Sequence, residues 1–284
     1  MKNNSINCTI IGFGNLGSAV CEQLPPDFNL IGIFSRRKSD RTIPLDEIKN
    51  YANQIDIAFF CGGSNTDAPE LVPILNELGI STVDSYDNHE KIGEYQRSIG
   101  FAQAKNRSTV AIIGAGWDPG YLSILRIYNR AILPNATHKT TYGPGVSMGH
   151  TNAIKTIPNV IDAQQITYPN KRVCYVVADK KHHKNIKNQI LNMDGYFKGQ
   201  RIIVKFKRFT PSQHHAGKLT SSSLTANITT QITMDSNPTF TARCMIAFAR
   251  VGYKMKTLGN TGAFTIDQIP PSLLLNDEQR LNEI

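Results

Sequence analysis

The stretch Ile10-Ile11-Gly12-Phe13-Gly14-Asn15-Leu16-Gly17 follows a short apolar run near the N-terminus and carries the glycine spacing GxGxxG. Gly12 lets the chain turn tightly out of a strand, Gly14 lets the backbone approach a pyrophosphate, and Gly17 lets the next helix lie close to the sheet. The unpaired N–H groups at the start of that helix favour an anion. The stretch therefore predicts the phosphate-binding turn of a dinucleotide site.

The residues on either side of this turn predict a βαβ unit. Residues 6–11 are rich in β-forming side chains, and residues 29–34 supply a second apolar strand. Between them, Leu16, Val20 and Leu24 recur at helical spacing. A lone glycine motif is a weak signal, but these flanking elements are what a dinucleotide site requires.

The second strand ends in Ser35-Arg36-Arg37, where a site for NAD usually has Asp or Glu. One hydroxyl and two guanidinium groups suit the 2′-phosphate of NADP, because Arg meets a phosphate with paired donors. The alternative is a solvated basic loop, which Lys38 and Arg41 favour. We expect NADP as the cofactor.

The composition is that of an ordinary soluble protein. Of 284 residues, 40% are hydrophobic and 19% are charged, and no apolar run is long enough to span a membrane. Residues 1–7 are polar and lack the apolar segment of a secretory signal. We therefore expect a cytoplasmic location and no membrane partner.

The charge pattern argues against nucleic-acid binding, and the spacing of the cysteines argues against a metal site. The net charge is +9, but the basic residues form no stripe interleaved with aromatic residues, so we expect no nucleic-acid partner. A phosphorylated cofactor and a dicarboxylate substrate would also favour a positive field. The five cysteines are scattered, with no close pair of the kind that binds zinc, so we expect buried thiols and no metal.

Alternating strands and helices up to residue 120 predict a doubly wound parallel sheet. Further strands are expected at 55–61, 81–84 and 109–113, with helices around 45–52, 71–78 and 90–104. The loops after these strands are Gly62-Gly63-Ser64, Asp84–His89 and Gly116–Gly120. Because the carboxyl ends of parallel strands share one edge, we expect these loops to converge on the nicotinamide end of the cofactor. Ordinary turn chemistry is the alternative for any one loop.

Beyond residue 120 the pattern becomes strand-rich and predicts a separate α+β domain with a mostly antiparallel sheet. Helices are expected at 121–133, 181–191 and 241–258, and strands at 140–146, 161–167, 172–177, 200–209 and 224–234. We therefore expect a nucleotide domain at 1–120 and a second domain at 121–242, which would bind substrate and dimerise. Residues 243–284 would form a C-terminal helix and tail that pack back toward the first domain.

Together these motifs resemble one family, the NADP-dependent meso-diaminopimelate dehydrogenases. The most specific run is Gly143-Pro144-Gly145-Val146-Ser147-Met148-Gly149-His150. The other matching runs cover nearly the whole chain in order: Gly12–Gly17, Ile33–Arg37, Val83–His89, Gly116–Gly120, Ile157-Pro158, Lys171-Arg172 and Asn237–Ala242. The resemblance implies a homodimer whose N-terminal Rossmann-type domain binds NADP and whose second domain closes over the substrate.

The reaction that the resemblance implies is reversible oxidative deamination at the D-centre of meso-2,6-diaminopimelate. The products are L-2-amino-6-oxopimelate, which cyclises to tetrahydrodipicolinate, ammonia and NADPH. Such an enzyme would serve the synthesis of lysine and of peptidoglycan precursors.

The family's site residues carry over by motif. The expected cofactor contacts are Gly12, Phe13, Gly14, Asn15, Leu16, Gly17, Ser35, Arg36, Arg37, Cys61, Gly62, Gly63, Ser64, Ser85, Tyr86, Asp87, Ala115, Gly116, Trp117, Asp118 and Pro119. The expected substrate contacts are Asp87, Asp118, Tyr142, Met148, Gly149, Thr167, Arg172, His215 and Asn227.

The chain departs from the family at three places. Tyr142 stands where many members have Trp or Phe, and the connection from Thr167 to Arg172 is short, so the chain resembles a short-loop form. The stretch 213–218 is also followed by a shortened spacing. The substrate-binding histidine could therefore be His215 or His214, with Lys218 as a substitute.

Two carboxylates are the candidate catalytic groups. Amine oxidation by hydride transfer needs a neutral amine, and Asp118 and Asp87 would hold the ammonium and help remove its proton. A turn or helix cap is the alternative role for each. Arg172 and Thr167 would grip the distal carboxylate, and an exposed Arg on an edge strand is the alternative there.

Two other functions remain open on the sequence. One is an NADP-dependent dehydrogenase of the same two-domain plan that acts on another diamine or D-amino acid. The other is a non-catalytic NADP sensor, which would bind the cofactor and turn over no amine.

Overall fold

The computed structural model describes residues 5–64, 66–105, 108–168, 170–193, 196–197, 199, 201–208 and 215–283, without the side chains of Met148 and Gly149. The chain divides into two compact units, unit 1 with residues 1–128 and 237–284 and unit 2 with residues 129–236. These bounds differ from the boundaries expected at 120/121 and 242/243. The difference arises because α7 is one continuous helix (Asn237–Thr257) whose residues join the core of unit 1.

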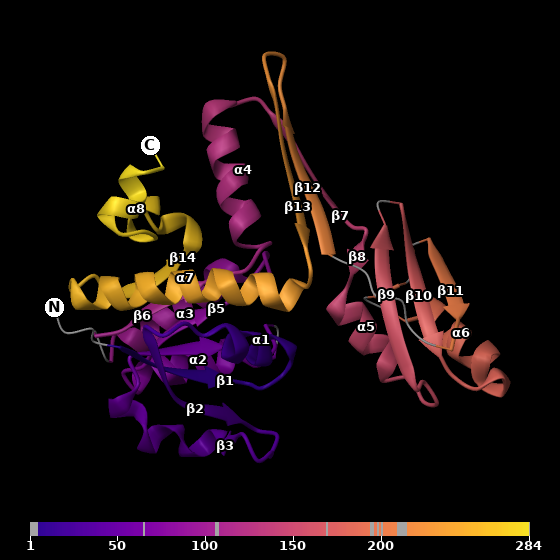
Figure 1. Ribbon diagram of the computed structural model, residues 1–284, viewed down its shortest axis with the longest axis horizontal. Helices are drawn as coiled ribbons and strands as arrows, with labels where there is room; N and C mark the ends of the chain where they lie inside the picture. The colour runs from indigo at the N-terminus through magenta and orange to yellow at the C-terminus, as the bar shows by residue number, and fades with distance from the viewer. Residues whose placement is uncertain are drawn as a thin grey trace. The chain divides into compact units, whose positions relative to one another are not determined.

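Unit 1 is built on a parallel sheet of seven strands, which confirms the predicted doubly wound fold (Figure 1). The strand order is β14-β6-β5-β4-β1-β2-β3. The strands are β1 (Ile6–Ile11), β2 (Phe28–Ser35), β3 (Ile43–Pro44), β4 (Ile57–Phe60), β5 (Ser81–Asp84), β6 (Val110–Ile113) and β14 (Gly262–Thr265). The two edge strands, β3 and β14, were not predicted, because two and four residues carry too little periodic pattern.

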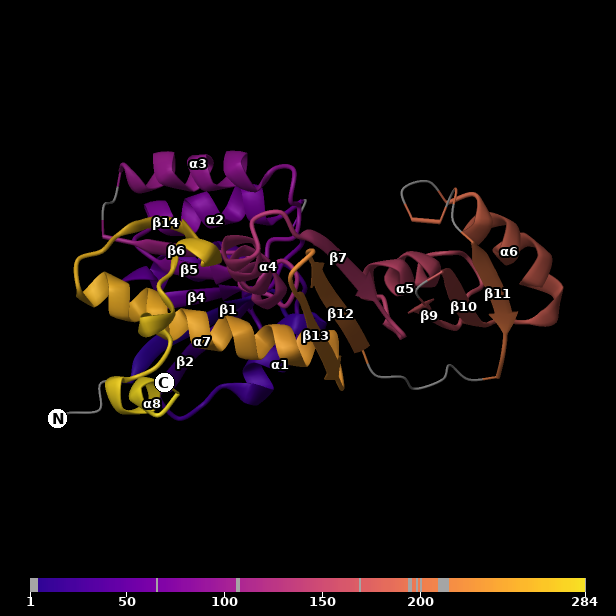
Figure 2. The same ribbon diagram turned by 90° about the horizontal axis from the view of Figure 1, so that it is seen from above.

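Helices cover both faces of this sheet. Figure 2 shows α2 (Ala68–Glu77) and α3 (Ile92–Gln103) on one side of the strands, and α1 (Asn15–Gln23) and α7 on the other. Side chains alternate between the two cores along β4, where Ile57 and Phe59 join the core with α7 and Phe60 joins the core with α2. This burial on both faces explains the near-continuous apolar run of that strand.

The helix that follows β6 begins in unit 1 and its last four residues belong to unit 2, and the remaining helical elements of unit 1 are short. Residues 45–54, where we expected part of a helix, form two 3-10 helices at Leu45–Asn50 and Ala52–Gln54. α4 (Tyr121–Ile132) follows β6, and α8 (Asp277–Leu281) lies near the C-terminus.

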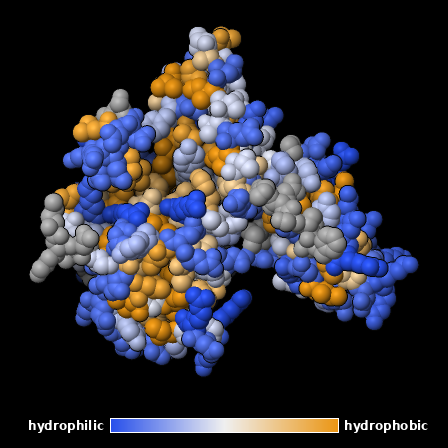
Figure 3. All heavy atoms as spheres, in the orientation of Figure 1, coloured by the Kyte–Doolittle hydropathy of each residue, from blue (hydrophilic) through white to orange (hydrophobic). Residues whose placement is uncertain are grey.

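Unit 2 contains two sheets where the sequence suggested one. The first has the order β11-β10-β9-β8 and comprises β8 (Gly145–Val146), β9 (Asp162–Tyr168), β10 (Lys171–Val177) and β11 (Ile202–Phe206). β9 and β10 are antiparallel, whereas β10 and β11 are parallel. Helices α5 (Met148–Lys155) and α6 (His183–Leu191) pack on it through a core that includes Ile154, Cys174 and Ile186. The visible surface around α6 and β11 is mostly hydrophilic (Figure 3).

The second sheet of unit 2 is antiparallel, with the order β13-β12-β7. Its strands are β7 (Thr137–Tyr142), β12 (His215–Ser222) and β13 (Asn227–Met234). β12 and α5 were not predicted. β12 was missed because His215, Gly217 and Ser221 are poor strand formers, which this strand buries between two partners.

Two findings concern the expectations about a membrane and about a metal site. None of the described helices is long and apolar enough to cross a membrane. Within the described part of the chain no group of His, Cys, Asp and Glu is arranged to hold a metal ion, and all five cysteines are free thiols.

Candidate functional site

The glycine turn after β1 has the geometry that a pyrophosphate requires. Gly12 has φ +92°, and a Cβ on Gly17 would lie 2.1 Å from the carbonyl oxygen of Gly12, so both positions need glycine. A Cβ on Gly14 would meet nothing within 4 Å, which leaves open space above the turn. α1 begins at Asn15 with Gly14 as its N-cap and without a side-chain cap. Open backbone at a helix N-terminus fits a bound phosphate group.

The basic stretch after β2 is tied to the loop after β4. The guanidinium of Arg36 lies 2.7 Å from a carboxylate oxygen of Asp67, and the other oxygen of Asp67 accepts a hydrogen bond from the Gly63 N–H at 3.0 Å. Burial acts to raise the pKa of Asp67, but the hydrogen bonds from Gly63 and Arg36 outweigh it and lower that pKa. Arg36 remains 65% exposed, so its other donors are accessible to a ligand.

Two further contacts lie in the basic stretch after β2 and at the glycine turn. The Ser35 hydroxyl accepts a hydrogen bond from the Arg37 N–H at 3.1 Å. The guanidinium of Arg41 lies 4.9 Å from the centre of the Phe13 ring, which brings a third cation to the glycine turn. Neither Asp67 nor Arg41 was predicted as a site residue, since each reads as ordinary loop or helix-start chemistry in the sequence.

Asp84 joins the loops that follow β5 and β6. One of its carboxylate oxygens accepts hydrogen bonds from the N–H groups of Tyr86 (2.9 Å) and Gly114 (3.1 Å), and the other accepts from the Tyr95 hydroxyl (2.8 Å). Asp84 is 1% exposed, and burial raises its pKa to about 6. The sequence placed this residue in a motif but gave no sign that it positions two loops. Tyr86 is also buried, whereas Asp87 is exposed.

Asp118 is held by an arginine of α4. The Asp118 side chain is 1% exposed, and both of its oxygens contact the guanidinium of Arg126, one of them at 3.1 Å. The Ser123 hydroxyl lies 3.0 Å from the same guanidinium and orients it. A fork of this kind fixes the carboxylate in direction. Arg126 was not predicted, because Asp118 lies before the first residue of α4 and helical spacing does not relate the two residues.

The predicted cofactor residues all follow strands at one edge of the sheet. They come directly after β1, β2, β4, β5 and β6, which are parallel neighbours. Cys61, Gly62, Gly63 and Ser64 follow β4, Ser85 follows β5, and Ala115, Gly116, Trp117 and Pro119 follow β6. The structure therefore brings these residues to the edge where ligands bind in open α/β sheets.

Thr167 and Arg172 lie directly opposite each other on β9 and β10. The Arg172 guanidinium donates to the Thr167 hydroxyl at 3.0 Å and to the side-chain oxygen of Gln165 at 3.4 Å. Both residues line a cavity of about 480 Å³ within unit 2. The other lining residues are Lys139, Thr140, Thr141, Tyr142, Tyr168, Asn170, Lys171 and Arg201.

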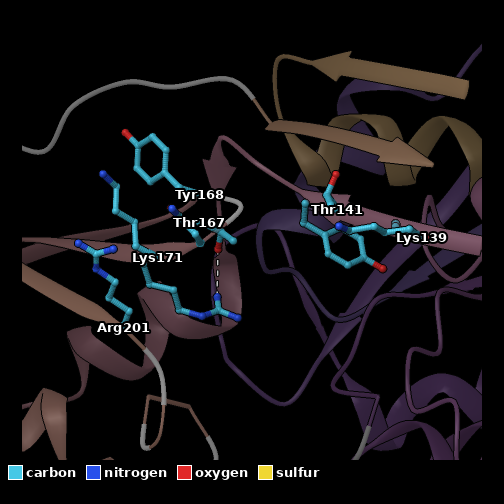
Figure 4. A pocket seen from close by; sticks show the side chains of 10 residues that line it. Lys139, Thr141, Thr167, Tyr168, Lys171 and Arg201 are labelled. Atoms are coloured by element: carbon cyan, nitrogen blue, oxygen red, sulfur yellow. Dashed lines mark hydrogen bonds between the residues drawn. The ribbon is translucent and has the colours of Figure 1, made fainter. Parts of the chain in front are cut away.

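Figure 4 shows the two sides from which the cavity is lined. Thr167, Tyr168, Lys171 and Arg201 come from the sheet of β9, β10 and β11 or its borders, and Thr141 and Lys139 come from β7. The predicted aromatic residue Tyr142 is also part of the lining and is 45% exposed.

His215 and Lys218, two of the candidates for contact with the distal end of the substrate, lie on opposite faces of β12. His215 is 8% exposed, and burial lowers its pKa to about 4, so it is neutral near pH 7. Lys218 lies three residues further along β12 and points to the opposite, exposed face. Residues 211–214, including His214, lie outside the described part of the chain.

Asn227 is at the wrong end of the hairpin for the predicted site. It pairs with Ser222, whereas His215 pairs with Met234 at the other end of the same two strands. The two pairs are seven positions apart along the strand, or roughly 23 Å at about 3.3 Å per residue. The structure therefore does not bring Asn227 to His215. Met148 and Gly149 open α5, and their side chains are not described.

Comparison with known proteins identifies similar chains. The family model described as the diaminopimelic acid dehydrogenase C-terminal domain matches residues 116–173. A meso-diaminopimelate D-dehydrogenase of Corynebacterium glutamicum is 36% identical over an alignment of 307 positions, gaps included, that covers 95% of each chain. The enzyme of the same name from Bacteroides fragilis is 31% identical over an alignment of 287 positions, gaps included, that covers 93% of each chain.

Two solved structures are similar over the whole length. The C. glutamicum DAP dehydrogenase in complex with DAP has a TM-score of 0.86 at 33% identity, covering 99% of this chain and 100% of that one. An engineered D-amino acid dehydrogenase bound to NADP+ has a TM-score of 0.84 at 32% identity, with the same coverage.

Proposed function

The chain belongs to the family of meso-diaminopimelate D-dehydrogenases, and from this premise we propose that it is an NADP-dependent dehydrogenase of meso-2,6-diaminopimelate. The reaction is the reversible oxidative deamination of the D-centre, with water consumed and ammonia, NADPH and L-2-amino-6-oxopimelate formed. The observation that carries the substrate assignment is the cavity lined by Thr167 and Arg172. A substrate with two amino-acid ends needs a separate grip on the end that does not react.

The residues at the edge of the parallel sheet fit NADP. Gly12, Gly14 and Gly17 accommodate the pyrophosphate, and Ser35, Arg36 and Arg37 supply donors for the 2′-phosphate. When bound, NADP supplies the hydride acceptor of the reaction. The ion pair between Arg36 and Asp67 holds the first of these guanidinium groups in place before the cofactor arrives.

Asp118 is the group that we assign to the reacting amine. Hydride transfer requires a neutral amine, and a carboxylate beside the ammonium can accept its hydrogen bond and assist the loss of its proton. Arg126 holds the Asp118 carboxylate in direction through contacts to both of its oxygens. Asp87 is exposed at the end of β5 and is the second carboxylate that we assign to this end.

We assign the distal end of the substrate, which does not react, to residues of unit 2. Arg172, already oriented by Thr167 and Gln165, donates paired hydrogen bonds to the distal carboxylate, and Tyr142 supplies an aromatic wall. We assign Met148 and Gly149 to the substrate from the family motif alone. His215 acts as a neutral hydrogen-bonding group if it contributes, because burial disfavours its charged form. Asn227 is left out of this proposal.

We also propose that the enzyme is a cytoplasmic homodimer that serves lysine and peptidoglycan precursor synthesis. This part rests on the resemblance of the motifs to the family. It is checked by measuring the molar mass in solution, and a monomer at micromolar concentration would contradict it.

The function is tested by following NADP reduction and ammonia release with meso-, LL- and DD-diaminopimelate, D-lysine and D-alanine. We expect the meso isomer to be turned over far faster than the LL isomer, which has no D-centre. Turnover of another amine in preference to the meso isomer would favour the related dehydrogenase of different specificity. Binding of NADP without turnover of any amine would favour the sensor.

A further inference from the structure

His150, in the first turn of α5, joins two segments of unit 2 through both of its ring nitrogens. Its Nδ1 lies 2.9 Å from the Ser147 hydroxyl, and its Nε2 lies 2.9 Å from the backbone carbonyl oxygen of Tyr196. A carbonyl oxygen only accepts, so Nε2 carries the proton. In the neutral ring Nδ1 is then unprotonated and accepts a hydrogen bond from the Ser147 hydroxyl. His150 is therefore held in one tautomer between the start of α5 and the segment after α6.

The surroundings of His150 keep its ring neutral and fixed in place. Burial lowers the pKa of His150, the positive charge of Arg172 lowers it further, and the hydrogen bond to the Tyr196 carbonyl acts in the opposite direction. The rings of Tyr196 and Phe197 meet the imidazole edge-on, with ring centres at 5.4 and 5.1 Å. Phe197 is 1% exposed and belongs to the core of this unit. The imidazole therefore has little freedom to turn.

Ser147 connects His150 to β9. The Ser147 N–H donates to the carbonyl oxygen of Gln165 at 2.9 Å, and one turn later the Thr151 hydroxyl accepts from the Gln165 N–H at 2.9 Å. A serine at an N-cap usually accepts a hydrogen bond from an N–H of the first helical turn. Ser147 is the N-cap of α5 but makes no such bond, and its hydroxyl instead contacts His150. The first turn of α5 is thus fixed to Gln165 at two points.

Gln165 connects α5 to Thr167 and Arg172, the two residues that we call the distal grip. Its side chain donates to the Thr167 hydroxyl at 3.2 Å and accepts from the Arg172 guanidinium at 3.4 Å. Gln165 is 0% exposed, so its side chain is confined by its neighbours. A shift of the first turn of α5 would move Gln165, and hydrogen bonds weaken steeply as their geometry departs from the preferred one. The orientation of the distal grip therefore depends on α5.

Building on the proposed function, we propose that His150 is a positioning residue for the distal end of the substrate and acts through Ser147 and Gln165 on the distal grip. His150 does not line the cavity that contains this grip. Its loss should therefore weaken binding of the substrate and leave binding of the cofactor unchanged. A residue that only stabilised the fold would not distinguish the two ligands.

The first test compares two histidines of unit 2. His150→Phe removes both hydrogen bonds and keeps an aromatic ring in the same place. The matched control is His183→Phe, because the Nε2 of His183 also lies 3.0 Å from a backbone carbonyl oxygen, that of Ala178, and its ring stacks on Phe206 at 3.7 Å. His183 is the first residue of α6 and does not line the cavity.

The measurement is calorimetric titration of each protein, loaded with NADPH, with meso-diaminopimelate. This complex does not react, because its cofactor is already reduced. We expect the Kd for meso-diaminopimelate to rise at least fivefold in His150→Phe and to stay unchanged in His183→Phe, with the Kd for NADPH unchanged in both. A parental Kd in His150→Phe, or an equal rise in both variants, would overturn the positioning role. A parent that neither binds nor oxidises meso-diaminopimelate would refute the proposed function instead.

The second test removes only the hydroxyl that His150 holds. Ser147→Ala should raise the Kd for meso-diaminopimelate at least threefold, and it decides alone if His150→Phe does not fold. A parental Kd in Ser147→Ala would overturn the connection through this hydroxyl. The double variant should bind no more weakly than His150→Phe, because both substitutions remove the same hydrogen bond. Effects that multiply in the double variant would show that the two residues act separately and would overturn the inference.

Discussion

Replacing Gly14 by alanine should separate cofactor binding from folding. Gly14 has φ −94° and ψ −159°, an extended conformation that alanine adopts freely, and its Cβ would meet nothing within 4 Å. Gly17 is the matched comparison three residues later, where a Cβ would lie 2.1 Å from the carbonyl oxygen of Gly12. The two substitutions add the same methyl group to the same turn in opposite environments.

The expected magnitudes follow from these two environments. Gly14→Ala should change the free energy of unfolding by less than about 1 kcal/mol, because the stabilisation from restricting the unfolded chain is offset by alanine being a poorer N-cap than glycine. The new methyl group takes the space into which the pyrophosphate must come. Losing one hydrogen bond to a charged group costs about 1.5–3 kcal/mol, so the Kd for NADP should rise roughly 10- to 150-fold. Gly17→Ala should lower the free energy of unfolding by about 1–3 kcal/mol or more, because a backbone oxygen must move.

The assay combines two measurements on each variant. Urea unfolding without cofactor gives the free energy of unfolding, and calorimetric titration with NADP gives the Kd. A Gly14→Ala protein that binds NADP as tightly as the parent would refute the assignment of the open space above Gly14 to the pyrophosphate. A Gly17→Ala protein of parental stability would show that the close approach of α1 to the turn is not required.

Four further predictions concern the other parts of the site. Replacing both Arg36 and Arg37 by Met should weaken binding of NADP by about 1.5–3 kcal/mol and that of NAD by less, as measured by titration with each; equal affinity of the parent for the two cofactors would contradict this. Asp118→Asn should keep the affinity for NADP and most of the free energy of unfolding. It should lower kcat about 100-fold or more, which is within the rate contribution of a general base. A variant that unfolds but keeps its activity per folded molecule would point to a capping role for Asp118. Arg172→Met should depress turnover of meso-diaminopimelate far more than residual turnover of D-alanine, since remote binding energy positions the reacting carbon; a meso rate within a few-fold of the parent would place the distal grip elsewhere. Burial raises the pKa of Asp84 from 3.8 to about 6 in the folded protein, so between these values the folded state holds more protons than the unfolded state. The free energy of unfolding therefore falls by on the order of 3 kcal/mol as pH rises through this window. Asp84→Asn should lack this fall in urea unfolding at pH 4 and pH 7, and an identical pH dependence in parent and variant would argue against the buried carboxyl as its source.

Local sequence patterns were sufficient for the framework of unit 1. The bounds of β1 and β5 match the expected strands residue for residue, and β2, β4 and β6 differ by a residue or two at their ends. Each of these strands lies in the interior of the sheet, and β4 and β6, which are buried on both faces, have the continuous apolar runs that such burial demands. The parallel alternation also predicted which loops share an edge of the sheet.

Tertiary structure decided the features that depend on distant partners. β14 exists because Gly262–Thr265 finds the open edge of β6, which lies about 150 residues earlier in the chain. The ion pairs of Asp67 with Arg36 and of Asp118 with Arg126, and the three hydrogen bonds of Asp84, likewise depend on which loops the fold brings together. The position of Asn227 likewise could not be predicted from local sequence, because its distance from His215 is set by the register of β12 with β13. A polar side chain carries no periodic signal of its own, so its partner is determined only when the apolar faces of the sheets and helices have packed.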